Sequence, residues 1–399
     1  MNLQYGPFDA SYDASHIRAD TGLSFDDVLL VPRRNRLRSR RDVDTAMQFT
    51  PGIRLAVPIV SANTPWCTGS RMAIAMARAG GIGIVHRMWS PHDQAAAVAA
   101  TKAAAPGDGA RATLDRAGRL SVGAAVGIKG DYLDRADRLA DSGADFLAID
   151  VAHGHSDFVI AALLELKARH PRLECVVGNV ATSDGARDLI DAGADAIKVG
   201  IGPGSVCTTR LVTGAGMPQL TAILECAAVT RKAGVGLIAD GGIRTSGDIA
   251  KAIAAGASCV MLGKLLAGTD ESEAREVEHD GRRFKVTTGF VTLGVELTLQ
   301  RLAGAAVSRS AFDAYLPEGV EGTFAHSGPV ADTLGRLVKG LCSGVTYSGC
   351  TAVAELADHA RFVRISNAGQ AEGRPHVRDG VPVLHPDFAR QFVTDPAGG

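Results

Sequence analysis

Short apolar segments alternate with Ala-rich amphipathic segments eight times along this chain, and this alternation constrains the fold more than any other feature. The apolar segments have the length and the Val and Ile content of buried strands. They span residues 54–62, 81–86, 120–127, 145–151, 174–180, 195–200, 236–240 and 258–263. Several of the intervening segments end in Gly, as helices commonly do. The pattern predicts an α/β fold, a (β/α)8 TIM barrel, rather than an open doubly wound sheet, because no GxGxxG sequence opens the first unit.

Two segments do not belong to a minimal barrel. Residues 87–118 connect the second and third predicted strands and are too short to form a second domain. Residues 270–350 follow the eighth strand, at the end of the barrel where substrate loops and lids occur. We therefore expect an N-terminal arm over residues 1–50, one catalytic barrel over residues 51–370 that includes this flap, and a C-terminal tail over residues 371–399.

Composition restricts the partners and the compartment. The 42 Lys and Arg residues against 43 Asp and Glu give a formal net charge of −1, which argues against electrostatic binding of nucleic acid or of an anionic membrane. The seven cysteines include no CxxC pair, so neither a disulfide framework nor a structural zinc site is expected. We see no signal peptide and no apolar stretch long enough to span a membrane. These features predict a cytoplasmic protein whose partners are small molecules.

The segment VGIGPGSVCTTR, residues 199–210, follows the sixth predicted strand and therefore faces the active-site end of a barrel. Gly202 and Gly204 permit tight backbone geometry and free backbone groups to coordinate an ion. Cys207 lies in this polar loop beside an Arg, where a cation and backbone donors would lower its thiol pKa and make it a nucleophile. The alternative, an inert buried thiol, is preferred for three cysteines in apolar patterns: Cys175, Cys226 and Cys259.

Two further loops have the features of phosphate sites. Gly242 lies in the loop after the seventh strand and Gly263 in the loop after the eighth, and these two loops commonly bind phosphate in barrels. Asp240 ends the seventh strand and can chelate two ribose hydroxyls, because Thr245 is better placed than Asp240 to cap the next helix. Lys264 either reaches a phosphate as a point charge or stays solvated, and the sequence leaves both interpretations open.

Several long motifs, in the same order along the chain, resemble the IMP dehydrogenase/GMP reductase family. They are LSFDDVLLVP (23–32), VVGNVAT (176–182), GIGPGSVCTTR (200–210), IADGGIRTSGDIAKAIAAGA (238–257) and PEGVEG (317–322). The resemblance runs from about Leu23 to the 360s. It implies a (β/α)8 barrel, a homotetramer, a purine-nucleotide substrate and a nicotinamide cofactor, NAD or alternatively NADP. It also implies that Cys207 attacks the purine C2, the carbon that exchanges a hydride with the cofactor.

The resemblance assigns substrate contacts to residues on several loops. Ser205, Gly242 and Gly263 match the phosphate ligands of the family. Asp240 matches the ribose ligand, and Asn179 lies in a motif that contacts the substrate. The substrate expected from these matches is a purine nucleoside monophosphate.

The resemblance also assigns the cofactor and cation sites. Asp150 and His153 match the cofactor loop of the family. The backbone carbonyls of Gly202, Gly204 and Cys207 match those that hold a monovalent cation, which implies potassium.

The two branches of the family resolve the C2 intermediate differently, and this chain is more similar to the dehydrogenases. Residues 150–156 and the PEGVEG motif have the dehydrogenase pattern, whereas Leu293 stands where reductases place a catalytic Glu at or beside that position. The leading hypothesis is therefore NAD-dependent oxidation of IMP to XMP through a covalent Cys207 intermediate. The alternatives are GMP reductase and a paralogue acting on a modified purine nucleotide. A flavin-dependent barrel oxidoreductase and an inactive nucleotide-binding protein also remain open.

The chain departs from the dehydrogenase pattern in the flap and in the connector. The family flap carries an Arg-Tyr pair that activates water, but here Arg309 is followed by Ser310. A Tyr that helps to hold the phosphate is absent near Thr287. The connector is too short for the CBS modules that many family members contain. A relay from Thr209 to Glu318 is the route that remains for activating water, since a hydroxyl beside a carboxylate can act as a general base.

Overall fold

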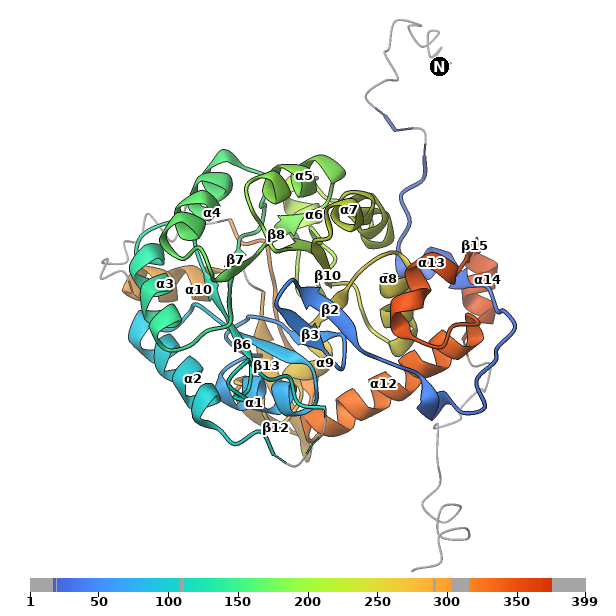
Figure 1. Cartoon of the computed structure of the whole chain (residues 1–399), viewed down its shortest axis with the longest axis horizontal. Coiled ribbons are helices and arrows are strands. Elements are labelled where there is room, and N and C mark those ends of the chain that lie inside the picture. Colours follow the sequence, from blue (N-terminus) through green and yellow to red (C-terminus); the bar gives the residue numbers. More distant parts are fainter. Residues whose placement is uncertain are drawn as a thin grey trace, which may run out of the picture.

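Eight parallel strands close into a barrel that helices surround (Figure 1). The computed structural model describes residues 17–18, 20–107, 109, 111–289, 292–302 and 316–374. In order around the barrel the strands are β4 (Ile59–Ser61), β5 (Ile82–Val85), β6 (Val122–Val126), β7 (Phe146–Asp150), β8 (Glu174–Val180), β9 (Ala196–Val199), β10 (Gly236–Asp240) and β11 (Cys259–Leu262). The last strand pairs with the first, so the predicted (β/α)8 barrel is confirmed.

Helices alternate with these strands, as the sequence pattern predicts. They are α1 (Ser70–Arg78), α2 (Pro91–Ala103), α3 (Tyr132–Asp141), α4 (Asp157–Arg169), α5 (Ser183–Asp191), α6 (Thr209–Thr213), α7 (Gln219–Ala233), α8 (Ser246–Ala254) and α9 (Lys264–Ala267). Thr245 caps α8 in a capping box with Asp248, as the sequence suggested. Asp240 is therefore not needed as a cap.

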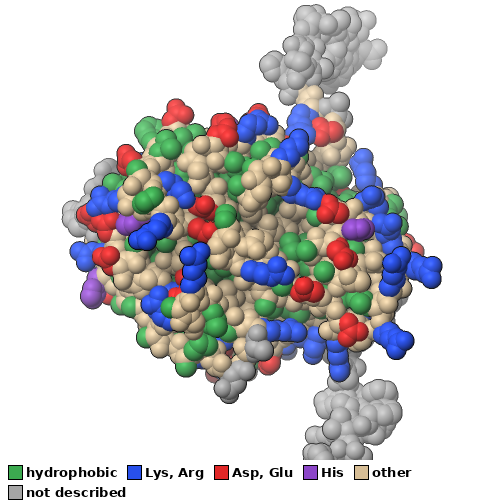
Figure 2. Space-filling view, viewed as in Figure 1, with side chains coloured by type: hydrophobic (Ala, Val, Ile, Leu, Met, Phe, Trp, Pro, Cys, Tyr) green, Lys and Arg blue, Asp and Glu red, His purple; other side chains and the backbone are tan. Residues whose placement is uncertain are grey.

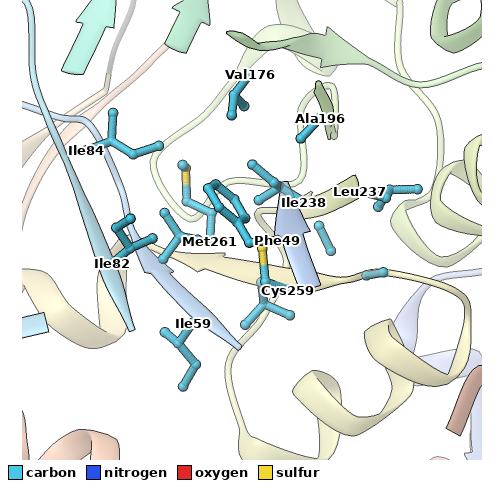
Figure 3. Close-up of a cluster of buried hydrophobic side chains, with 14 of the residues drawn as sticks. Phe49, Ile59, Ile82, Ile84, Val176, Ala196, Leu237, Ile238, Cys259 and Met261 are labelled. Atoms are coloured by element: carbon cyan, nitrogen blue, oxygen red, sulfur yellow. The ribbon is translucent and has the colours of Figure 1, made fainter. Parts of the chain in front are cut away.

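The first predicted strand is divided, which corrects the expected boundary at residues 54–62. It forms β3 (Ile53–Leu55) and β4, separated by a break at Pro58, whose missing N–H interrupts strand pairing. β3 instead pairs with β2 (Met47–Thr50) in an antiparallel hairpin. Phe49 of this hairpin is 1% exposed and lies among the buried side chains of the barrel strands (Figure 3). The hairpin thus contributes to the core.

The segment after β11 forms a three-stranded antiparallel sheet, which we call the cover sheet. Its strands are β12 (Glu276–His279), β13 (Arg282–Thr288) and β14 (Glu321–Ala325). Helix α10 (Leu293–Leu302) follows β13, and α12 (Val330–Tyr347) follows β14. The sequence predicted a flap here but not a sheet. Arg309 and Ser310, the predicted remnant of the flap base pair, lie outside the described residues.

The two ends of the described chain are joined by strand pairing. β1 (Val28–Leu30) pairs with β15 (Phe362–Arg364). The short elements nearby are η2 (Phe25–Asp27), η3 (Arg40–Asp42), η4 (Val353–Glu355), α13 (Leu356–His359) and α14 (Asn367–Glu372). Most of the predicted tail, residues 375–399, lies outside the described part.

The connector between β5 and β6 holds one helix, α2, as expected. Lys102 at the end of α2 lies 3.0 Å from Asp115 and 2.6 Å from Asp145, which ties the connector to the start of β7. Acidic and basic side chains are interspersed on the face shown in Figure 2, in keeping with the small net charge. No helix in the described part of the chain combines the length and the hydrophobicity that crossing a membrane requires.

Acid should destabilise the fold through His86, which follows β5. This side chain is fully buried, its Nδ1 accepts a hydrogen bond from the Met88 N–H, and its Nε2 has no partner among the described residues. Burial, with a contribution from Arg135, lowers the pKa of His86 from 6.5 to about 3. The unfolded chain therefore binds a proton below about pH 6.5 that the folded chain does not. We expect the free energy of unfolding to fall by about 2 kcal/mol from this residue between pH 6.5 and pH 5.

Denaturant unfolding at several pH values measures this effect. In His86→Gln, whose amide does not titrate, the slope of stability against pH should be shallower over the same range. Equal slopes in the two proteins would show that His86 does not contribute.

Candidate active site

A cavity lies at the carboxyl ends of the barrel strands, between the strand loops and the cover sheet. All of the predicted site residues except His153 line it: Asp150, Asn179, Gly202, Gly204, Ser205, Cys207, Thr209, Asp240, Gly242, Gly263 and Glu318. His153 is exposed on the loop after β7 and is not among the lining residues. The fold therefore gathers side chains from six widely separated segments of the sequence into one site.

The loop after β9 holds Cys207 at this cavity. The Cys207 thiol donates a hydrogen bond to the Thr209 hydroxyl, with 3.2 Å between sulfur and oxygen. The loop also pairs with the chain just before β14: Cys207 forms a β-bridge with Gly319, and the Thr208 N–H donates to the Glu318 carbonyl at 2.9 Å. This pairing brings Glu318 to the cavity, although its carboxylate forms no hydrogen bond with Thr209.

Arg210 shapes this loop. Its Nε donates to the Ile201 carbonyl at 3.1 Å, and the guanidinium also donates to the Met217 carbonyl. Gly202 and Gly216 have φ values of 80° and 151°, and a Cβ on either would lie within 2.7 Å of the Arg210 side chain. The guanidinium of Arg210, the cation that the sequence places near Cys207, therefore binds backbone carbonyls and stabilises the conformation of the loop.

Cys207 differs from the other cysteines in its exposure. The other six are buried, whereas Cys207 is partly accessible. Burial raises the pKa of the Cys175 and Cys226 thiols to about 12 and also raises that of Cys259. The prediction that these three are structural thiols agrees with their burial, since nucleophilic cysteines need access and a stabilised thiolate.

A buried charged cluster underlies the cavity. Lys198 on β9 is 2% exposed, and its ammonium lies 2.5 Å from Asp150 and 2.8 Å from Asp240. Burial disfavours the charged amine, but the two carboxylates outweigh burial and raise the pKa of Lys198 above its ordinary value. Asn63 donates to Asp150 at 2.8 Å, and Asn179 donates to Asp240 at 3.0 Å. The two acids are therefore held as fixed carboxylates by one shared cation.

The sequence analysis missed Lys198 and Asn63. A signal for Lys198 was present, because a lysine inside the apolar strand AIKV has to find a counter-charge when that strand is buried. The partners of the lysine could not be identified, since Asp150 and Asp240 come from strands 48 and 42 residues away. Asn63 follows β4 and carried no signal that separates it from an ordinary loop residue.

The cavity contains backbone oxygens suited to a monovalent cation. The carbonyls of Gly202 and Cys207 accept no hydrogen bond from the described residues, whereas the Gly204 carbonyl accepts one from the Cys207 N–H at 3.2 Å. Carbonyl oxygens are the kind of ligand that alkali cations prefer. In the part of the chain that the structure describes, no group of three or more His, Cys, Asp or Glu side chains could hold a metal ion.

Comparison with known proteins identifies the relatives of this chain. A family model described as IMP dehydrogenase / GMP reductase domain matches residues 22–376. An inosine-5′-monophosphate dehydrogenase from Nitrosopumilus maritimus is 35% identical, over 89% of this chain and 98% of that protein. A GMP reductase from Leishmania donovani is 36% identical, over 89% of this chain and 96% of that protein.

A solved structure extends the similarity to the fold. It is a Cys-to-Ala variant of GMP reductase from Trypanosoma brucei in complex with guanosine 5′-monophosphate, with a TM-score of 0.84 and 34% identity. The match covers 92% of this chain and 100% of that one. Relatives that carry out either of the two reactions are therefore similar to this chain to nearly the same extent.

Proposed function

We propose, because this chain belongs to the IMP dehydrogenase/GMP reductase family, that it oxidises IMP at C2 to XMP with NAD as the hydride acceptor. Members of this family are oxidoreductases that act on purine nucleotides. The observation that carries the proposal is the arrangement around Cys207: its thiol lies 3.2 Å from the Thr209 hydroxyl, and backbone pairing brings Glu318 to the same cavity. These residues supply a nucleophile and, at the same cavity, the hydroxyl and the carboxylate that a proton relay needs.

The substrate is held mainly by loops other than that of Cys207, to which Ser205 of the Cys207 loop adds one lining residue. Gly242 and Gly263 border the cavity after β10 and β11, where backbone N–H groups can bind a phosphate. The Asp240 carboxylate contacts Lys198 and Asn179 through the same oxygen, Oδ2. The other oxygen, Oδ1, is free of contacts with the described residues and can accept hydrogen bonds from the ribose hydroxyls.

The reaction proceeds in two halves. In the first, the sulfur of Cys207 bonds to C2 and the thiol proton passes to the neighbouring ring nitrogen, which releases it to solvent when C2 gives up its hydride. A nicotinamide cofactor, when bound, supplies the acceptor for that hydride. Val151 and Ala152 line the cavity beside Asp150 and would border the ring of that cofactor. In the second half, water attacks C2 and the C–S bond breaks, while Thr209 passes the proton of the water to Glu318.

A nicotinamide absorbance assay tests the proposal. The purified protein, given IMP and NAD, should form NADH and XMP. The second candidate is GMP reductase, which the relatives from Leishmania donovani and Trypanosoma brucei favour. Consumption of NADPH with release of ammonia from GMP, and no NADH from IMP, would assign the chain to that reaction. Activity with neither pair would reject both.

Potassium should activate the enzyme. We propose that the carbonyls of Gly202, Gly204 and Cys207 hold the ion and keep Cys207 positioned for attack. Replacing a bulky organic cation by potassium at constant ionic strength should raise kcat about tenfold or more, because ordering a nucleophile is worth several kcal/mol. Steady-state rates in the two chloride salts measure this. Equal rates would reject the site, and sodium provides a control for ion size.

A further inference from the structure

Residues 318–320, which we call the bridging segment, lie between the end of β13 and the Cys207 loop and form hydrogen bonds with both. The Gly289 N–H donates to the Val320 carbonyl at 2.9 Å, which continues the pairing of β13 with β14 beyond the bounds of the two strands. The Val320 N–H in turn donates to the Val206 carbonyl at 2.9 Å. The bridging segment therefore joins the Cys207 loop to the cover sheet.

The Cys207 loop is held by this segment on each side of the nucleophile. Val206 precedes Cys207 and accepts the hydrogen bond described above. Thr208 follows Cys207 and donates to the Glu318 carbonyl at 2.9 Å. Within the loop itself, the Cys207 N–H donates to the Gly204 carbonyl at a longer distance, 3.2 Å. The position of the nucleophile therefore depends on the cover sheet as well as on the barrel.

Two glycines allow the three chain segments to approach one another this closely. A Cβ added to Gly319 would lie 2.7 Å from the Gly289 Cα and 3.2 Å from the Val206 carbonyl oxygen. A Cβ added to Gly289 would lie 2.5 Å from the Gly319 Cα and 3.1 Å from the same oxygen. Neither glycine has a positive φ, so the lack of space, and not the backbone conformation, requires glycine here. The obstructing atoms belong to the backbone, so no rotation of a side chain can relieve the overlap.

We propose that Gly289 and Gly319 are positioning residues for the nucleophile: their crossing sets the distance between the cover sheet and the Cys207 loop, and thereby places the sulfur for attack. The inference rests on the proposed function, because it takes Cys207 as the group that attacks the substrate. Neither glycine lines the cavity, so both act through the backbone of the residues beside Cys207. A displacement of about 1 Å in a reacting group can cost about 10²-fold in rate.

Gly319→Ala tests the crossing. The added methyl group should push the Cys207 loop away from the cover sheet and lower kcat about 10²-fold or more. The Kd for the nucleotide should stay within about threefold of the wild type, because the loops at Gly242 and Gly263 border the cavity on other strands. Gly322→Ala is the matched control. It adds the same methyl group on β14, where nothing lies within 4 Å of the new Cβ, and should leave kcat unchanged.

Alkylation of the Cys207 thiol by iodoacetamide reports the position of the loop without turnover. Cys207 is partly accessible and the other six cysteines are buried, so intact-protein mass spectrometry can follow a single adduct. In Gly319→Ala we expect the labelling rate to rise about threefold or more, because the loop loses backbone hydrogen bonds on both sides of the thiol. A role confined to overall stability would lower the denaturation midpoint and leave the labelling rate of the folded protein unchanged.

Val320→Pro breaks the same contact without adding a group at the crossing of the glycines. Proline removes the N–H that donates to Val206, and the Val320 side chain is 50% exposed, so the core is not disturbed. The variant should reproduce both the loss of kcat and the faster labelling. It carries the test if Gly319→Ala fails to fold.

The labelling rate separates this inference from the proposed function. If both Gly319→Ala and Val320→Pro are labelled faster but the wild type oxidises no IMP and reduces no GMP, the crossing stands and the proposed function fails. If the wild type is active and both variants keep its kcat and its labelling rate, the crossing is wrong and the function stands. A lower kcat with unchanged labelling, or an equal effect in Gly322→Ala, would also overturn the inference. If the wild type is inactive and labelling is the same in all the variants, both are wrong.

Discussion

Replacing Cys207 with Ala should lower turnover by about 10⁴-fold or more and leave nucleotide affinity within about threefold of the wild type. Removing a nucleophile that forms a covalent intermediate eliminates the reaction path, rather than one contact of many. The thiol forms its hydrogen bond with Thr209, whereas the carboxylate of Asp240 and the loops at Gly242 and Gly263 border the cavity independently. Steady-state rates and calorimetric titration with the nucleotide measure the two quantities.

The matched control is Cys226→Ala. This thiol on α7 is fully buried, donates to the Thr182 carbonyl at 3.4 Å and is not among the residues that line the cavity. We expect a loss of about 1–2 kcal/mol in the free energy of unfolding and a normal rate at saturating substrate. Substantial activity in Cys207→Ala would rule out covalent catalysis through this residue. Equal loss of activity in both variants would point to instability as the cause.

The barrel could be predicted because its strands are buried on both faces. Such strands appear as short continuous apolar runs that need no information about their neighbours. The boundary error at residues 54–62 has a local cause, since the run is apolar throughout but Pro58 interrupts its pairing. The cover sheet was missed for the opposite reason. β12 reads EVEH and β13 reads RRFKVTT, and only the alternate positions of β13 are buried.

The part of the candidate site that lies on a single loop could be predicted from the sequence. Cys207 and Thr209 are two residues apart, so the Gly-rich loop that contains them could be interpreted as a unit. The cluster of Lys198 with Asp150 and Asp240 was not predictable, because it depends on three strands whose order only the closed barrel determines. Lys264 could be singled out because it follows Gly263 in a loop predicted to bind phosphate, but only the structure shows that it lines the cavity with its ammonium 5.6 Å from the Phe324 ring.

The proposed dehydrogenase should release its product slowly, and the time course should show a burst. In the proposed mechanism, Cys207 and the cavity residues beside Asp150 would provide for hydride transfer. Activation of water would depend on Thr209 and Glu318, because the sequence lacks the Tyr of the usual Arg-Tyr pair. With IMP and NAD we expect about one equivalent of NADH per active site in a rapid phase, followed by slow turnover. Intact-protein mass spectrometry should detect the adduct on Cys207 during the slow phase.

Glu318→Gln tests whether the relay limits the slow phase. The Glu318 contact with the Cys207 loop runs through its backbone carbonyl, which accepts from the Thr208 N–H, so the variant should keep the pairing and lose only the carboxylate. Loss of a general base typically costs about 10²–10⁴-fold, and here the cost should fall on the slow phase while the burst keeps its amplitude. Glu321→Gln, on an exposed residue of β14 that does not line the cavity, is the control and should change neither phase.

A linear time course without an adduct would show that hydrolysis is not limiting. A burst that shrinks in Glu318→Gln would place the carboxylate in the first half of the reaction, since only a group needed before hydride transfer can reduce the amount of NADH formed in that phase.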